Sequence, residues 1–406
     1  MLRSRLLPVI EEALRAVGAP EGVRIVLEYP RGESRWDLAT PVAFALAARI
    51  GAGIDTPPHD RTQAHARPAN ASQSDTLPGA TPMELARAIA AALPHEEAGI
   101  EEIAVAPPGF INLRLSPSFW HDCLRAVLAA TGNGSAHREP VTAGRAEITL
   151  VLPHGRGGNV PGSSTELPEL DTLPLAHART MLLGMAMHRL LELTGWECGL
   201  GMAEASHGDA PAVHVHRAGP DGIAENTIRP NVHVAAVENG TAASITFGDL
   251  VREIGEAARW VLLDCHPSLP ITIDLAEART QSERVPARYA AYAHARAAGV
   301  LRHAAAEGIA VERSAPLEPL RSDTEIRLIG QIAQWDDLLE RAAETLAPEM
   351  IPEYLHRLAA ALNRFLVECR ILPEAPPLRA ARLALLAGAA ETMARGLGIV
   401  LPDAGR

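Results

Sequence analysis

Two side chains in the stretch TLPLAHARTMLLG (172–184) have the types and spacing to act on an anion, namely His177 and Arg179. A strand-like segment, AEITLVL (146–152), precedes them, and a long helical pattern follows. A strand leading into a helix is the opening of an α/β nucleotide-binding layer, where the helix N-terminus holds phosphate oxygens. The pattern predicts a nucleotide-handling helix that begins at these residues.

Histidines elsewhere suggest a metal site only weakly. His214 and His216 alternate in PAVHVHRA, so both imidazoles lie on one face of a strand, and His233 is in a second short strand. Sixteen histidines in a chain rich in alanine and arginine make a chance pairing the simpler interpretation. We therefore predict no metal site. The four scattered cysteines form no Cys-x-x-Cys pair and are expected to be buried thiols: Cys123, Cys198, Cys265 and Cys369.

Composition limits the class of protein. With 406 residues and 47% apolar content, the chain can build two or three cores. The net charge of −12 disfavours nucleic acid overall, but residues 281–406 hold 15 Arg against 16 Asp and Glu and are nearly neutral. All 37 basic residues are arginine. No apolar run is long enough for a bilayer, and Glu11 and Glu12 interrupt the apolar start, so we expect a cytoplasmic protein without a membrane partner.

The first block, 1–142, is predicted to be α+β. Thr81 and Glu84 form a capping box at the start of one helix, and the pattern at 100–116 predicts a hairpin turned by Pro-Pro-Gly. The segment at 54–82 is rich in Pro, Ser, Thr, Asn and Asp and is predicted to be a mobile loop. The further elements expected are helices at 1–17, 41–53 and 83–93 and a strand at 23–29.

The second and third blocks differ in class. Residues 143–280 are predicted to form a reduced Rossmann-like α/β layer, and residues 281–406 an all-α bundle. The elements expected in the layer are strands at 146–152, 211–218 and 230–237, helices at 174–195 and 247–264, and an insertion at 153–172. The fold class is thus multidomain α/β plus all-α.

Several segments resemble the class I arginyl-tRNA synthetases. DLATPVAFALAARIG and APPGFINLRLS are similar to the family's N-terminal domain, which touches the tRNA elbow. YAHARAAGVLR, the segment 346–372 and LRAARLALL resemble its anticodon-binding (DALR) helical domain. The resemblance implies binding of tRNA, with arginine tRNA as the expected species, and leaves any protein partner open. It points to the following contact residues: Phe110, Asn112, Arg114, Arg296, Arg302, Tyr354, Arg357, Asn363, Arg364, Arg379 and Arg382.

The centre departs from this family. Its first signature, P-L-H-V-G-H-A-R, is here Pro-Leu-Ala-His-Ala-Arg at 174–179, without the first histidine and the glycine. Its second, K-M-S-K-R before V-T-L-D-D-L, is represented only by the downstream part of VENGTAASITFGDL (237–250). Losing one preorganised donor to a reacting anion costs about 10²–10³ in rate. The resemblance leaves His177 as the catalytic candidate, with His177 and Arg179 as the nucleotide-binding residues. Arg156 and Arg179 are the nearest substitutes for the missing lysines.

Three functions follow as alternatives. The first is a tRNA-binding protein of arginyl-tRNA synthetase type that lacks aminoacylation. The second is an active arginine–tRNA ligase that uses ATP and magnesium. The third is a scaffold or regulatory protein that binds no RNA.

Overall fold

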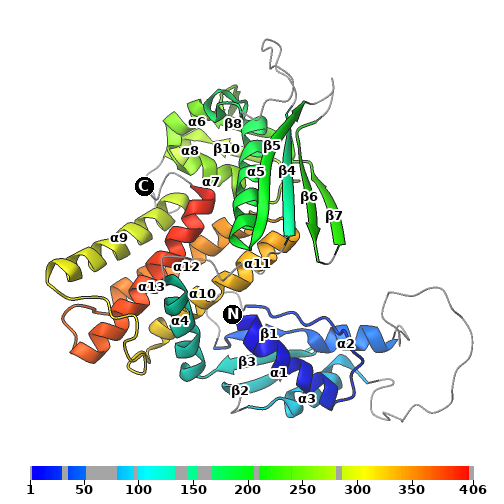
Figure 1. The fold of residues 1–406 in the computed structure, drawn as a ribbon, viewed down its shortest axis with the longest axis vertical. Coiled ribbons are helices and arrows are strands. Elements are labelled where there is room, and N and C mark those ends of the chain that lie inside the picture. Colours follow the sequence, from blue (N-terminus) through cyan, green and yellow to red (C-terminus); the bar gives the residue numbers. More distant parts are fainter. Residues whose placement is uncertain are drawn as a thin grey trace, which may run out of the picture. The chain divides into compact units, whose positions relative to one another are not determined.

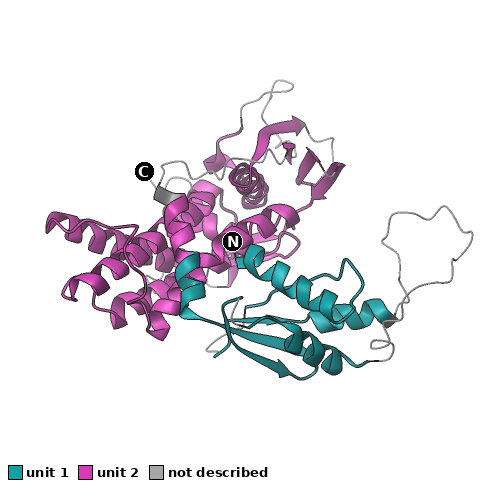
Figure 2. Ribbon diagram, turned by 60° about the horizontal axis from the view of Figure 1, so that its bottom comes forward, with its two compact units in different colours: residues 1–123 teal, residues 124–406 magenta. Residues whose placement is uncertain are grey.

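A computed structural model describes residues 2–29, 35–51, 80–95, 98–132, 144–152, 167–204, 210–220, 222–238, 240–279 and 286–401. The chain divides into two compact units, Met1–Cys123 and Leu124–Arg406, coloured teal and magenta in Figure 2. Most of the predicted loop at 54–82 and most of the insertion at 153–172 lie outside the described residues.

The first unit is an antiparallel sheet with helices, as the sequence predicts. The strand order is β1-β3-β2. Its elements are α1 (Leu2–Ala16), β1 (Leu38–Thr40), α2 (Val42–Gly51), α3 (Pro82–Ala92), β2 (Ile100–Ala106), β3 (Phe110–Leu115) and the beginning of α4 (Pro117–Gly132). The prediction of a regular strand at 23–29 is wrong. Ile25 and Leu27 are buried, but the backbone pairs only at the isolated bridge between Glu28 and Ala39.

The capping box and the hairpin are confirmed. The Thr81 side chain accepts from the Glu84 N–H at 3.3 Å, and the Glu84 carboxylate accepts from the Thr81 N–H at 2.8 Å. In the hairpin turn, a Cβ on Gly109 would lie 2.9 Å from the Pro82 carbonyl oxygen, so only glycine fits there. The turn fixes the register of β3, which buries Ile111 and Leu113 on one face of the sheet.

The second unit begins with a reduced α/β layer. One sheet has the order β5-β4-β6-β7, with β4 and β5 parallel and the other pairs antiparallel. Figure 1 shows α5 along one face of this sheet, and Gly184 permits the contact because a Cβ there would lie 2.3 Å from Leu150 Cδ2. The elements are β4 (Gly144–Leu152), η1 (Leu170–Thr172), α5 (Leu175–Leu193), β5 (Trp196–Glu204), β6 (Ala212–Gly219) and β7 (Gly222–Ile228).

A smaller sheet of order β10-β8-β9 completes the layer, with β8 and β10 parallel. Its strands are β8 (Val234–Glu238), β9 (Thr241–Ala243) and β10 (Ile271–Asp274), followed by α8 (Leu275–Arg279). The prediction of a single helix at 247–264 is wrong. It is two helices, α6 (Phe247–Ile254) and α7 (Ala257–Leu263), because Gly255 has φ 64° and ψ −148°, a conformation that breaks the helix.

The C-terminal bundle is confirmed. Its helices are α9 (Pro286–Ala306), α10 (Asp323–Ala333), α11 (Trp335–Thr345), α12 (Met350–Glu368) and α13 (Pro376–Val400). By length and composition α13 alone among the described helices resembles a membrane span, but 78% of that stretch is buried inside the protein. Gly396 allows close packing, since a Cβ there would lie 2.6 Å from Leu355 Cδ2. Among the cysteines, Cys123 and Cys369 are buried, whereas Cys198 and Cys265 are partly exposed.

Candidate nucleic-acid interface

The surface between α9 and α12 brings together polar and aromatic groups suited to RNA. Arg296 Nη1 on α9 donates to Asn363 Oδ1 on α12 at 2.8 Å. The Arg296 guanidinium lies 5.6 Å from the centroid of the Tyr292 ring, and Tyr292 is 56% exposed. One turn earlier, the rings of Tyr289 and His356 are 5.5 Å apart. Stacking surfaces beside a guanidinium and an amide are the usual means of holding unpaired bases.

A cavity of about 390 Å³ continues this surface. It is lined by Val300 on α9, Leu366 on α12 and residues 369–373 of the following turn. Val300 lies four residues after Arg296, so the cavity is one helical turn further along the same face of α9. We call the surface from Tyr289 to this cavity the α9–α12 groove. Its length along α9 is roughly 16 Å, from eleven residues at about 1.5 Å each.

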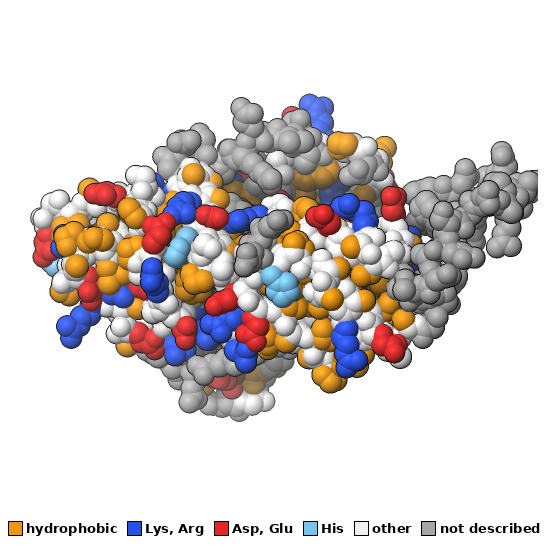
Figure 3. All heavy atoms as spheres, turned by 90° about the horizontal axis from the view of Figure 1, so that it is seen from below, with side chains coloured by type: hydrophobic (Ala, Val, Ile, Leu, Met, Phe, Trp, Pro, Cys, Tyr) orange, Lys and Arg blue, Asp and Glu red, His pale blue; other side chains and the backbone are white. Residues whose placement is uncertain are grey.

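Charge favours an anionic ligand at this groove. The helix Pro286–Ala306 contains three arginines and no Asp or Glu, although the whole chain carries a net charge of −12. On the face that Figure 3 shows, basic and acidic side chains are interspersed, without a broad area of one sign. A local basic helix can attract phosphates where the total charge does not.

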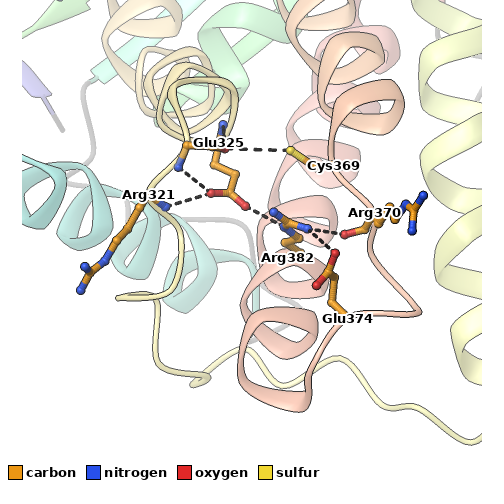
Figure 4. Close-up of polar contacts among 7 residues, drawn as sticks. Arg321, Glu325, Cys369, Arg370, Glu374 and Arg382 are labelled. Carbon is orange, nitrogen blue, oxygen red and sulfur yellow. Dashed lines mark hydrogen bonds and ion pairs between the residues drawn. The ribbon is translucent and has the colours of Figure 1, made fainter.

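Two predicted contact residues of the bundle are buried and do not fit a role in touching RNA. Tyr354 is 0% exposed, and its hydroxyl donates to the Gln331 carbonyl oxygen at 2.9 Å. Arg382 donates from Nε to Glu325 Oε1 at 2.7 Å, and their side chains are only 12% and 2% exposed. Figure 4 shows Arg382 between Glu325 on one side and Glu374 and the Arg370 carbonyl on the other, so it holds the turn between α12 and α13.

The other predicted arginines of the bundle lie on or near the surface. Arg357 pairs with Glu353 at 3.0 Å, and Arg364 pairs with Glu368 at 2.9 Å, each within α12. Arg379 and Arg302 differ from them. Arg379 is partly buried and donates to the Leu372 carbonyl at 3.5 Å, whereas Arg302 is exposed on α9. RNA contact by these four residues stays a prediction.

In the first unit, the three predicted residues share one face of the central strand β3. Phe110 packs edge-on against Phe44, with ring centroids 5.4 Å apart. Asn112 lies between Ala39 of β1 and Ala104 of β2 and is partly exposed. Arg114 pairs with Glu101 at 3.3 Å, Nε to Oε2. An aromatic ring, an amide and a guanidinium therefore follow one another along the face opposite the buried one.

Sequence reasoning missed a neighbouring group in this unit. Arg35 lies over the Trp36 ring, 4.7 Å from its centroid, and forms an ion pair with Glu102 of β2. The signal was the adjacent arginine and tryptophan in SRWDLAT, directly before β1. Since Glu102 is opposite Arg114 in the β2–β3 register, this cation–aromatic pair lies at the edge of the same face.

Of the predicted nucleotide-binding pair, Arg179 is not available for that role, and the role of His177 stays a prediction. His177 lies half-buried in the first turn of α5, and burial lowers its pKa, so the imidazole is neutral near pH 7. Arg179 is 0% exposed, and its guanidinium donates to the carbonyl oxygens of Leu269 at 2.8 Å and His266 at 3.1 Å. The guanidinium therefore ties α5 to the segment after α7 and is not available as a phosphate clamp. Arg156 lies outside the described residues.

The N-termini of α5 and α6 lie beside each other, and that of α6 is closed by its own chain. The Phe247 N–H donates to the Leu173 carbonyl at 2.9 Å, and Pro174 forms a bridge with Thr246. The Asp249 carboxylate accepts from the N–H and hydroxyl of Thr246, both at 2.8 Å. A side-chain carboxylate and a backbone carbonyl thus occupy donors at the start of α6 that a phosphate would need, whereas no side chain caps the start of α5.

The histidine pair of β6 has partners of its own. His214 Nδ1 lies 2.9 Å from Thr227 Oγ1, and His216 Nδ1 lies 3.3 Å from Glu225 Oε1, both across to β7. Within the part of the chain that the structure describes, no three His, Cys, Asp or Glu side chains are grouped closely enough to hold a metal ion.

Both ends of the chain match known protein families. Residues 4–115 match the family described as "Arginyl tRNA synthetase N terminal domain", and residues 290–402 match "DALR anticodon binding domain". The arginine–tRNA ligase of Moorella thermoacetica is 36% identical over 169 residues, which is 40% of this chain and 30% of that protein. The ligase of Salinibacter ruber is 33% identical over 38% of this chain and 28% of its own length. The match thus spans less than a third of these relatives.

Solved structures agree with the fold. The arginyl-tRNA synthetase of Thermus thermophilus gives a TM-score of 0.62 at 14% identity, covering 98% of this chain and 99% of that one. The enzyme of Plasmodium falciparum gives 0.57 at 10% identity, with 98% and 97% covered. The arrangement of α+β domain, α/β layer and helical bundle is that of a multidomain aminoacyl-tRNA synthetase. With both terminal domains matched, the chain belongs to the arginyl-tRNA synthetase family.

Proposed function

We propose that this protein binds tRNA through the α9–α12 groove and the partly exposed face of β3, and that it does not aminoacylate. The observation that carries the first part is the grouping of Arg296, Asn363 and Tyr292 on a helix pair whose α9 member has no acidic residue. Arginine tRNA is the proposed ligand, because the relatives are named as arginine–tRNA ligases. The cytoplasm, where tRNA acts, is the proposed location.

The binding mode follows from the two surfaces. The groove offers a guanidinium for phosphate and aromatic faces for unpaired bases, over a length of roughly 16 Å that suits two or three extended nucleotides. Phe110 and Asn112 on β3 offer a second stacking and hydrogen-bonding surface. Because arginine side chains that bind RNA phosphates release the counterions held there, the logarithm of affinity should fall linearly with the logarithm of salt concentration.

The absence of aminoacylation is supported by the centre of the molecule. ATP and magnesium would have to approach the N-termini of α5 and α6, where Phe247 is hydrogen-bonded to Leu173. Arg179 is committed to backbone carbonyls, and the chain contains no lysine to neutralise a leaving pyrophosphate. These residues do not fit a bound nucleotide, so we derive no catalytic step through one.

Two titrations test the proposal against its alternatives. Filter binding of an arginine tRNA transcript to the full chain at low salt should show saturable binding that weakens with added salt. Failure to bind at low salt would leave the scaffold alternative. Arginine-dependent exchange of pyrophosphate into ATP should stay at background, and clear turnover would establish the ligase alternative, for which the retained His177 is the candidate residue.

A further inference from the structure

Strand β7 forms one edge of the four-stranded sheet. Among the described residues it pairs only with β6, and Figure 1 shows it at the end of the order β5-β4-β6-β7. Its first six residues, Gly222–Thr227, are exposed, and Ile223 is 73% exposed. On its outer side the strand therefore presents backbone N–H and C=O groups that no described strand pairs with.

This edge lacks several features that usually prevent strands from pairing between molecules. Such features are prolines, lysines and β-bulges within the edge strand. The segment GIAENTI contains no proline and no lysine, and its register with β6 runs without a shift from Gly222 to Ile228. Pro230 comes two residues after the strand and would end any pairing there. The remaining protective feature is a single charge, Glu225, which opposes a like charge and favours an opposite one.

The charges at this edge are complementary to themselves. Glu225 and Arg229 are four residues apart, and the alternation of side chains along a strand places both on the same side as Thr227. The Glu225 side chain is 80% exposed, and its Oε1 lies 3.3 Å from His216 Nδ1, which leaves Oε2 for a second donor. Arg229 is exposed and forms no ion pair with any residue that the structure describes. Both charges are therefore available to a strand added at this edge.

We propose that β7 pairs antiparallel with β7 of a second copy of this chain, so that two four-stranded sheets join into one. The two-fold axis of such a pair is perpendicular to the sheet and passes beside the same residue of β7 in each copy. An axis at Glu225 would bring two carboxylates together, and an axis at Asn226 would place Glu225 opposite Thr227. An axis at Thr227 places Glu225 of each copy opposite Arg229 of the other. The charges select this last register, because it forms two ion pairs.

Strand β5, at the other edge of the sheet, does not have this property. Its segment WECGLGMAE contains two glutamates and no basic residue, and Glu197 is already paired with Arg145 of β4 at 2.9 Å. Two copies of β5 would therefore gain no ion pair. Pairing of β7 with itself closes the assembly at two copies, whereas pairing of β7 with β5 would continue from copy to copy without limit.

The test is analytical ultracentrifugation of the full chain at low salt, where exposed ion pairs are least screened. The wild-type chain should change from one copy to two as its concentration rises. In Glu225→Arg both charges at the edge are positive, and in Arg229→Glu both are negative. Each variant alone should dimerise about tenfold more weakly, because two attractive pairs per dimer become repulsive. Arg189→Glu, which reverses an exposed charge on α5, is the matched control and should dimerise as the wild type does.

A mixture of the two variants is the sharper test. Each positive edge then faces a negative one, so Glu225→Arg and Arg229→Glu together should dimerise with about the wild-type affinity, although neither does so alone. A wild-type chain that stays a single copy at every concentration, or that grows beyond two copies, would overturn the proposal. So would single variants that dimerise like the wild type, or a mixture that dimerises no better than its components. The assembly does not depend on RNA, so these outcomes leave the proposed tRNA binding untouched.

Discussion

Replacing Arg296 by alanine should weaken tRNA binding about tenfold. The guanidinium lies over Tyr292 and has donors left after bonding Asn363, so it can form one charge-assisted contact with a phosphate. Such a bond contributes about 1.5–3 kcal/mol, and the partial exposure of Arg296 favours the lower end, or roughly a factor of ten. The slope of log affinity against log salt should decrease in magnitude by about 0.7, the contribution of one phosphate on a single strand.

The assay is filter binding of arginine tRNA over a range of salt concentrations. Arg189→Ala is the control, because Arg189 is an exposed arginine of α5 paired with Glu192 at 3.2 Å, outside the groove. It should leave both affinity and slope unchanged. If Arg296→Ala binds tRNA with the wild-type affinity and the wild-type slope, the groove is not the site of phosphate contact.

Three further predictions concern the folded state. Arg382→Ala should destabilise the chain by about 3 kcal/mol in urea unfolding, because it leaves Glu325 buried without its cation; an unchanged midpoint would contradict the buried pair. Gly184→Ala should cost about 1–3 kcal/mol by the same measurement, since the new Cβ would overlap Leu150; wild-type stability would show that the sheet and α5 can separate freely. Burial alone would raise the pKa of Glu325, but hydrogen bonds from Ser322 and Arg382 lower it below its ordinary value. The ionised Glu325 therefore stabilises the fold above about pH 4.5, and this stabilisation is lost as the pH falls through the lower pKa of the folded state. In acid unfolding, the stability of the Glu325→Gln variant should fall less steeply over that pH range.

Local signals gave the correct prediction where neighbouring residues determine the structure. The capping box of Thr81 and Glu84 involves residues three apart, and the 100–116 hairpin is closed by its own Pro-Pro-Gly turn. The bundle helices show a continuous apolar periodicity. Strand β7 was missed because GIAENTI lies exposed at a sheet edge and has no alternation of apolar and polar residues. The break between α6 and α7 depends on one glycine with positive φ.

The site was harder to predict because its members are distant in sequence. Arg296 and Asn363 are 67 residues apart and meet only through the packing of α9 against α12. The sequence named both as contact residues by resemblance, but it contained no sign that they bond each other. Arginine is usually a surface residue, and only the tertiary structure shows that Arg179 and Arg382 are buried with backbone or carboxylate partners. The burial of an arginine side chain depends on partners that are distant in sequence, and the apolar periodicity of the sequence does not reveal them.

Formation of arginyl-tRNA by the pure chain tests the central claim most directly. The protein, in excess over an arginine tRNA whose binding is recorded in the same samples, would be incubated with arginine, ATP and magnesium. We expect bound tRNA and no charged product above the protein-free control. Charged tRNA accumulating with time and protein concentration would contradict the proposal that the N-termini of α5 and α6 no longer admit a nucleotide.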